Sequence, residues 1–158
     1  MIADQIQMGN AEGDEGNYIL PVEAQVISIV YNKNVFEKYD LEVPTTYEEF
    51  KEVCNTLSEN GVAPLFLGGA NGWQNVNVFT MLCSQLDTTM FDKAQSGEIK
   101  WTDEKMVEAM SNFKLMFDDG IFQVGAMSAD ANTNGTPAFV SDSAAMMALG
   151  SWWCQEFT

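Results

Sequence analysis

Histidine and arginine are both absent from this 158-residue chain, and seven lysines supply all of its positive side-chain charge. Without histidine, neither a Ser-His-Asp triad nor an imidazole metal ligand can form within the chain. Without arginine, no guanidinium can hold a phosphate or carboxylate through two parallel hydrogen bonds. The 23 acidic residues leave a formal net charge of -16. That charge opposes binding to nucleic acids and to anionic membrane surfaces, so we expect neither as a partner.

Long apolar runs and a basic leader are also missing. The run Ala144–Leu149 is far too short to cross a bilayer, and the first twenty residues have no features of a signal peptide. The three cysteines, Cys54, Cys83 and Cys154, have spacings that match no zinc or redox motif. We expect Cys54 and Cys83 to be small buried apolar residues within helices. No metal or cofactor is predicted.

Apolar residues make up 46% of the chain and aromatic residues 11%, which is sufficient for one domain with a core. Residues 1–17 are polar, acidic and interrupted by glycines, so they are interpreted as a loose lead-in to a single α/β domain over residues 18–158. Apolar, β-branched runs predict strands at 26–31, 63–67 and 144–149. Helical patterns lie between these runs, and the alternation indicates an α/β layer architecture.

Capping signals delimit two of the predicted helices. Thr45 and Glu48 have capping-box spacing, and the helix that they begin ends at Asn60. Thr102 is the predicted cap of a helix that ends at Gly120. Shorter helices are predicted at 35–39, 76–86 and 136–140, with an extended edge segment at 97–101.

A glycine-rich loop, residues 68–73, follows the second predicted strand. It has no lysine and no Ser/Thr after its last glycine, so it is not a P-loop. It does carry Asn71 and Trp73 at the end of a strand, where open α/β sheets bind ligands. The alternative is that Trp73 covers the core.

The segment Gly150-Ser151-Trp152-Trp153 follows the last predicted strand in the same way. Adjacent indoles point in different directions, so at most one can face the core and the other is available to a groove or an interface. Sugar rings stack their C–H faces on indoles, and their hydroxyls bind amides, carboxylates and hydroxyls. Such a set is present in Trp73, Trp152, Asn71, Ser151 and Glu23. A pair of core aromatics remains the alternative.

The acidic residues do not form a recognisable catalytic pair. Glycoside hydrolysis requires two carboxylates about 5 to 10 Å apart across one bond, and no spacing in the chain identifies such a pair. Residues 130–134 offer oxygen donors but lack the pattern and terminal glutamate of a calcium-binding EF-hand, so turn chemistry explains them better. We therefore expect a non-enzymatic protein.

Several motifs occur in an order that resembles a known family. They are Tyr18-Ile19-Leu20-Pro21, Ile29-Val30-Tyr31-Asn32-Lys33-Asn34-Val35-Phe36, Leu41-Glu42-Val43-Pro44-Thr45-Thr46-Tyr47-Glu48-Glu49-Phe50, Gly61-Val62-Ala63-Pro64-Leu65 and Ala144-Ala145-Met146-Met147-Ala148-Leu149-Gly150-Ser151-Trp152. In this order they resemble the extracellular solute-binding proteins of carbohydrate ABC transporters, across roughly residues 18 to 157.

The resemblance implies one lobe of a two-lobed, periplasmic-binding-protein-like clamshell, with helices around a small mixed sheet. It implies the second lobe alone, from a longer receptor that is monomeric, either periplasmic or a membrane-anchored lipoprotein, and that delivers its sugar to an ABC permease. Trp152 matches the sugar-stacking aromatic of the family, and Trp73 lies where another cleft aromatic is often found. Asn71, Gln74 and Glu23 are the expected hydroxyl partners. Because arginine is absent, a neutral mono- or oligosaccharide is favoured.

Three other functions remain open at this point. The same fold could bind a non-sugar solute such as a peptide or polyol. The chain could be part of a surface-attached glycoside-degrading enzyme. Exposed indoles at Trp152-Trp153 could instead serve protein interaction.

Overall fold

A three-stranded sheet organises the computed structural model, which describes residues 25–153. The strand order is β1-β3-β2, with β1 (Ile27–Tyr31) antiparallel and β2 (Ala63–Phe66) parallel to the central strand β3 (Ala144–Gly150). All seven residues of β3 are buried. A central strand covered on both faces requires such an unbroken apolar sequence. The predicted strands and the small mixed α/β sheet are therefore confirmed.

The helices are inserted between the strands in chain order. They are α2 (Lys33–Lys38), α3 (Tyr47–Glu59), α4 (Trp73–Leu86), α5 (Met90–Gln95), α6 (Glu104–Asp118) and α7 (Thr136–Val140), with the short turns η1 (Gly69–Asn71), η2 (Ala126–Ser128) and η3 (Ala131–Gly135). None of the helices in the described part of the chain has the length and apolar character that a membrane crossing requires.

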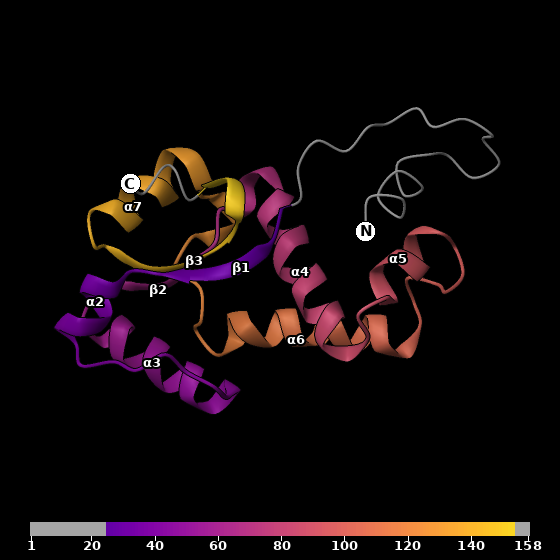
Figure 1. Cartoon of the computed structure of the whole chain (residues 1–158), viewed down its shortest axis with the longest axis horizontal. Helices are drawn as coiled ribbons and strands as arrows, with labels where there is room; N and C mark the ends of the chain where they lie inside the picture. The colour runs from indigo at the N-terminus through magenta and orange to yellow at the C-terminus, as the bar shows by residue number, and fades with distance from the viewer. Residues whose placement is uncertain (1–24, 154–158) are drawn as a thin grey trace.

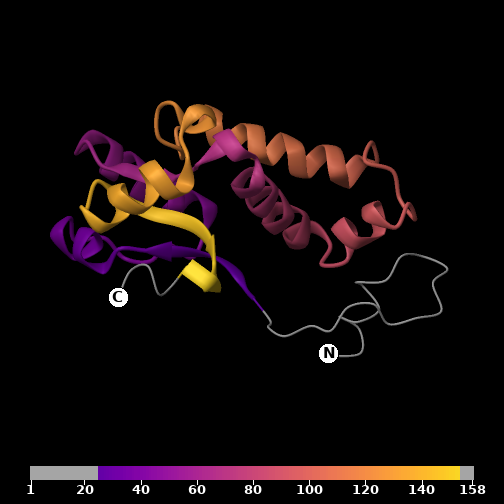
Figure 2. The ribbon, with the colours of Figure 1, turned by 90° about the horizontal axis from the view of Figure 1, so that it is seen from above.

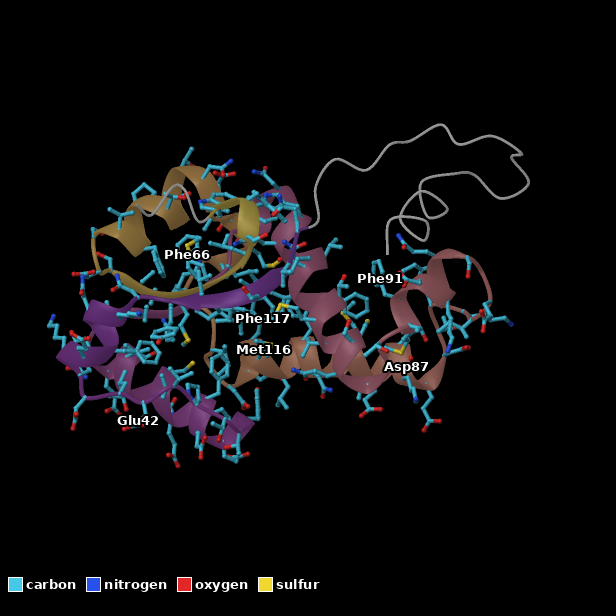
Figure 3. The ribbon with its side chains drawn as sticks, viewed as in Figure 1. Glu42, Phe66, Asp87, Phe91, Met116 and Phe117 are labelled. Atoms are coloured by element: carbon cyan, nitrogen blue, oxygen red, sulfur yellow. The ribbon has the colours of Figure 1, made fainter. Side chains whose placement is uncertain are left out.

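Helices cover both faces of the sheet. In Figure 1, α7 lies on one side of the strands and α2 and α3 lie on the other. Side chains of β2 alternate between these layers, because Leu65 belongs to the main apolar cluster with α3 and Phe66 to a second cluster under α7. Figure 3 shows the same division, with Phe66 on the α7 side and Met116 of α6 on the other.

Helices α4, α5 and α6 form an arm that extends away from the sheet (Figure 2). A third apolar cluster holds this arm together and includes Cys83, Met90 and Met106. Cys54, in α3, and Cys83 are buried free thiols, as predicted. Burial raises the pKa of Cys54 to about 12, which keeps it a protonated apolar residue at neutral pH. Cys154 lies outside the described residues.

The capping box of α3 lies one residue later than predicted. Thr46 is the N-cap, and its side chain accepts a hydrogen bond from the backbone N–H of Glu49. The Glu49 carboxylate in turn accepts from the backbone N–H groups of Thr45, at 2.7 Å, and Thr46, at 3.1 Å. The prediction failed because two adjacent threonines are each followed, three residues later, by a glutamate.

Other helix boundaries and short segments also differ from those that the sequence predicted. Gly72 adopts φ 77° and directly precedes α4, so that helix begins at Trp73 rather than at residue 76. Asp103 replaces Thr102 as the cap of α6. Residues 97–101 form turns and not the predicted edge segment, and α5 was not predicted. Residues 131–135 form a π-turn, which Asp130 caps by accepting from two backbone N–H groups.

Candidate functional site

The carboxyl ends of β2 and β3 meet at one end of the sheet, where β1 begins. Phe66 of β2 pairs with Met147 of β3, and Ile27 of β1 lies opposite Gly150. The segments that follow β2 and β3 therefore emerge side by side. We call residues 68–72, 150–153 and 25–26 the carboxyl edge. Open α/β sheets bind ligands at this kind of edge.

Trp152 is the exposed aromatic residue of the carboxyl edge. Its side chain is 41% exposed, whereas Gly150 beside it is buried. A Cβ added at Gly150 would lie 1.7 Å from Cζ3 of the Trp152 ring. The indole therefore lies directly on the Gly150 backbone, and any larger residue at position 150 would displace it.

Trp153 points into the molecule, so the prediction that at most one of the two indoles faces the core is confirmed. Its ring stacks on that of Trp73, with centroids 5.4 Å apart and an interplanar angle of 20°. Its Nε1–H donates to Oγ1 of Thr136 at 3.1 Å. One face of Trp73 is thus covered by Trp153, and the side chain is half-buried. Packing explains much of the environment of Trp73, and less of its ring is open to a ligand than of Trp152.

Ser151 joins the two segments by which the chain enters and leaves the sheet. Its backbone N–H donates to the Val26 carbonyl at 2.9 Å, and its Oγ accepts from the Val26 N–H at 3.2 Å. The same hydroxyl donates to Oε1 of Gln25. Ser151 is therefore engaged mainly within the protein. Glu23, the other predicted partner on this side, lies outside the described residues.

An amide and a carboxylate lie together on the other side of the carboxyl edge. Nδ2 of Asn71 donates to Oδ2 of Asp130. Oδ1 of Asp130 accepts from the backbone N–H groups of Asn132, at 2.9 Å, and Thr133, at 2.8 Å. The bond from the Thr133 backbone is the main cause that lowers the pKa of Asp130 below its usual range. Asp130 is therefore a carboxylate at neutral pH, and it holds Asn71 in place at the surface.

Gln74 is in a position that differs from its predicted role. Its side chain is fully buried, with 0% exposure. Its Oε1 accepts from the Gly68 N–H, and its Nε2 donates to the Ala148 carbonyl at 3.1 Å. A buried amide whose oxygen and nitrogen are both bonded to backbone cannot contact a solute in this structure. Gln74 therefore holds the carboxyl edge together, and we withdraw it from the set of ligand-contacting residues.

Comparisons with known proteins identify the family of this chain. The sequence profile of the bacterial extracellular solute-binding proteins matches residues 3–157. This chain belongs to that family. It is 31% identical over 142 residues to the multiple sugar-binding protein of Streptococcus mutans, a match that covers 85% of this chain and 33% of the relative. It is 30% identical over 129 residues to the alpha-glucosides-binding periplasmic protein AglE of Rhizobium meliloti, covering 78% and 28% of the two chains.

A solved structure shares the fold as well as the sequence pattern. It comes from work on xylan utilization by the thermophilic bacterium Caldanaerobius polysaccharolyticus, and it matches with a TM-score of 0.74 and 26% identity. The match covers 84% of this chain and 34% of the solved one. The chain thus spans about a third of the length of the solute-binding proteins that it matches. The family and the two curated relatives are described as binding proteins.

A groove lies apart from the loops of the carboxyl edge. It has a volume of about 420 Å³ and lies between β1, β3, α4 and the segment that leads into α3. Ile29, Tyr31, Val43, Tyr47 and Phe50 are among the residues that line it. The hydroxyl of Tyr47 donates to Oδ2 of Asp119 at 3.1 Å. We call this region the apolar groove. It offers few polar groups, whereas a sugar needs a hydrogen-bonding partner for most of its hydroxyls.

Sequence reasoning missed two side chains, Asp130 and Gln123, that hold the loop after β2 in place at the carboxyl edge. Asp130 was identified in sequence as a turn residue, and its contact with Asn71 spans 59 positions. Gln123 binds both backbone groups of Leu67, with Oε1 and Nε2 each 2.9 Å from their partners. No local pattern signals either contact, because each depends on a loop that returns to the end of β2. Among the described residues, no cluster of three His, Cys, Asp or Glu side chains could hold a metal ion.

Proposed function

We propose that this chain forms one lobe of a two-lobed carbohydrate receptor of an ABC import system. The lobe, which comprises residues 18–158, contributes one side of a cleft in which a neutral mono- or oligosaccharide binds. Closure of the two lobes then favours the form that delivers the sugar to a membrane permease. The full-length receptor is a monomer outside the cytoplasmic membrane, either periplasmic or lipid-anchored, and it does not alter its ligand chemically.

One observation carries this proposal. An indole that is 41% exposed, Trp152, lies on the backbone of Gly150 at the carboxyl edge of a chain from a solute-binding family. The amide of Asn71 and the carboxylate of Asp130 occupy the loop side of the same edge. An indole face for C–H groups together with an amide and a carboxylate for hydroxyls is the combination that sugars require. The family relatives named for sugar and alpha-glucoside binding point to the same ligand class.

The charges at the carboxyl edge favour a neutral sugar over an anionic one. None of the seven lysines falls within residues 67–74, 130–136 or 148–153, and the chain has no arginine. The ionised carboxylate of Asp130 would repel an acidic sugar. In this proposal Trp152 stacks on the ring, Asn71 and Asp130 bind hydroxyls, and Trp73 contributes the part of its ring that Trp153 leaves free. Glu23 and the remaining bonding capacity of the Ser151 hydroxyl stay in the proposed set.

A ligand panel on the full-length protein tests this function. Neutral mono- and oligosaccharides, polyols and short peptides are compared by thermal shift, and each compound that raises the Tm is titrated by calorimetry. A ligand present at 100 times its Kd stabilises the folded protein by about 2.7 kcal/mol, which such a screen detects. We expect a neutral saccharide to bind. Binding of peptides or polyols without any saccharide would favour the non-sugar receptor, and turnover of a chromogenic glycoside would identify an enzyme.

A further inference from the structure

Gln74 is the one buried polar side chain in the part of the chain that the structure describes. Burying an amide is unfavourable unless its donor and its acceptor both find partners. The retained amide therefore needs a structural reason. Its two hydrogen bonds supply one, because one ends on the loop that follows β2 and the other on β3.

Both partners of Gln74 are backbone groups just beyond the parallel ladder. The last pair between β2 and β3 is Phe66 with Met147. Gly68 follows β2, and its N–H donates to Oε1 of Gln74, while the carbonyl of Ala148, the next residue along β3, accepts from Nε2 at 3.1 Å. The amide thus links the strands where their backbones separate. The first turn of α4, which carries Gln74, is fixed by the same two bonds.

Close packing makes the position of the Gly68 loop dependent on this link. A Cβ at Gly68 would lie 2.3 Å from the backbone nitrogen of Ala131, so the loop and η3 touch through their backbones. Asn71 lies three residues beyond Gly68 and is bonded to Asp130, which precedes η3. On the other strand, Ala148 lies two residues before Gly150, on which the indole of Trp152 rests. Gln74 therefore stands between the two halves of the proposed sugar site.

We propose that Gln74 is a positioning residue that sets the distance between the Gly68–Asn71 loop and the Gly150–Trp152 turn. The inference rests on the proposed sugar-binding function of this edge. A binding site must hold its contacting groups within a few tenths of an ångström of the productive geometry. The affinity for sugar should therefore depend on the hydrogen bonds that the Gln74 side chain accepts and donates, as well as on the volume of that side chain.

The substitution Gln74→Glu tests this dependence in the full-length protein. A carboxylate can still accept from Gly68, but it cannot donate to Ala148, and it places a second acceptor against that carbonyl. At pH values high enough to ionise this buried carboxyl, sugar affinity should fall on the order of tenfold or more. At acidic pH the introduced carboxyl takes up a proton, and burial makes it do so at a higher pH than an exposed glutamate. The protonated group can make both hydrogen bonds, so acidification should restore affinity relative to the wild type.

The matched control is Gln85→Glu, which introduces the same charge at an exposed position in the last turn of α4. Its affinity should equal that of the wild type at every pH. The probe is the neutral saccharide that binds most tightly in the ligand panel, titrated by calorimetry at several pH values, with the Tm recorded in parallel. A loss of affinity in Gln74→Glu that recovers on acidification supports the inference.

Two results would overturn it. One is a folded Gln74→Glu protein whose affinity equals that of the wild type at every pH of the series, including alkaline values at which the introduced carboxyl is ionised. The other is a loss that does not recover as the pH falls. If Gln74→Glu does not fold, Gln74→Met decides, because it preserves the apolar volume and removes both hydrogen bonds; wild-type affinity in that variant would contradict a positioning role. Failure of the wild-type protein to bind any saccharide would instead remove the proposed function, and this inference with it.

Discussion

The carboxyl edge and the apolar groove are built in opposite ways. The groove rests on the main apolar cluster, since Leu65 and Met146 belong both to its lining and to that cluster. The carboxyl edge depends on specific hydrogen bonds, from Gln74 to β3 and to the loop that follows β2 and from Asn71 to Asp130, and on close backbone contact at Gly68. Concavity alone would favour the groove as a binding site. The distribution of polar groups favours the edge, and for a sugar the polar groups decide.

This contrast predicts that stability and binding can be separated by mutation. Residues under the groove should determine the free energy of unfolding, and residues of the carboxyl edge should determine ligand affinity. Variants of the full-length protein can test each half of the statement.

The largest effect is expected from Leu57→Ala. Leu57 has 0% exposure and lies in the main apolar cluster. Loss of its buried methyl groups, together with the cavity left behind, should lower the free energy of unfolding by about 2–5 kcal/mol. Urea denaturation measures this change, and Val107→Ala, at a site 52% exposed on α6, is the control with little expected change. A loss from Leu57→Ala no greater than that of the control would show that the cluster does not support the lobe.

Trp152→Ala should have the next largest effect, on affinity rather than stability. Truncation of a stacking indole should weaken saccharide binding by about 2 kcal/mol or more, as seen for aromatic anchors in binding sites. Calorimetric titration of the full-length protein measures this loss.

The matched control for that experiment is Trp101→Ala. Trp101 is 53% exposed and contacts Phe91 edge-on on the helical arm, away from the carboxyl edge. Its replacement should leave the affinity unchanged. Equal affinity losses in the two tryptophan variants would contradict the assignment of binding to the carboxyl edge.

A smaller effect with a defined pH dependence is expected at the N-terminal cap of α3. Hydrogen bonds from Thr45 and Thr46, the first from the Thr45 backbone, lower the pKa of Glu49 below its ordinary value near 4.5. A carboxylate whose pKa is lower in the folded than in the unfolded state stabilises the fold at pH values above its ordinary pKa. That contribution is lost as the pH falls from about 4.5 through the lower folded value.

Glu49→Gln should therefore be less stable than the wild type at pH 7, and the difference should shrink by pH 3. Chemical denaturation at the two pH values measures it, and sugar affinity at pH 7 should be unaffected. Glu52→Gln removes the same charge from the middle of α3 without touching the helix cap, and it serves as the control. A wild-type advantage that is the same at both pH values would show that ionisation of Glu49 does not stabilise the cap.

Local sequence patterns were sufficient for the strands and for most helices. The β-branched and apolar runs of β1, β2 and β3 identified all three strands, because a covered strand needs consecutive apolar residues. The same reasoning misplaced the capping box by one residue and missed α5. Its errors lie at short segments in which two adjacent residues offer equivalent caps, or in which the pattern is too brief to distinguish a helix from a turn.

For the candidate site, too, the sequence predicted some features and only the structure showed the others. Composition and motif order, without coordinates, already indicated a family of solute-binding proteins, two strand-to-helix loops, and one exposed indole in the Trp152-Trp153 pair. Only the tertiary structure shows which residues contact one another. The burial of Gln74, the stack of Trp73 on Trp153 and the bond from Asn71 to Asp130 connect segments that are up to 80 positions apart. Periodicity reports the environment of a residue within its own element, whereas such partners are set by how strands and loops from distant parts of the chain come together.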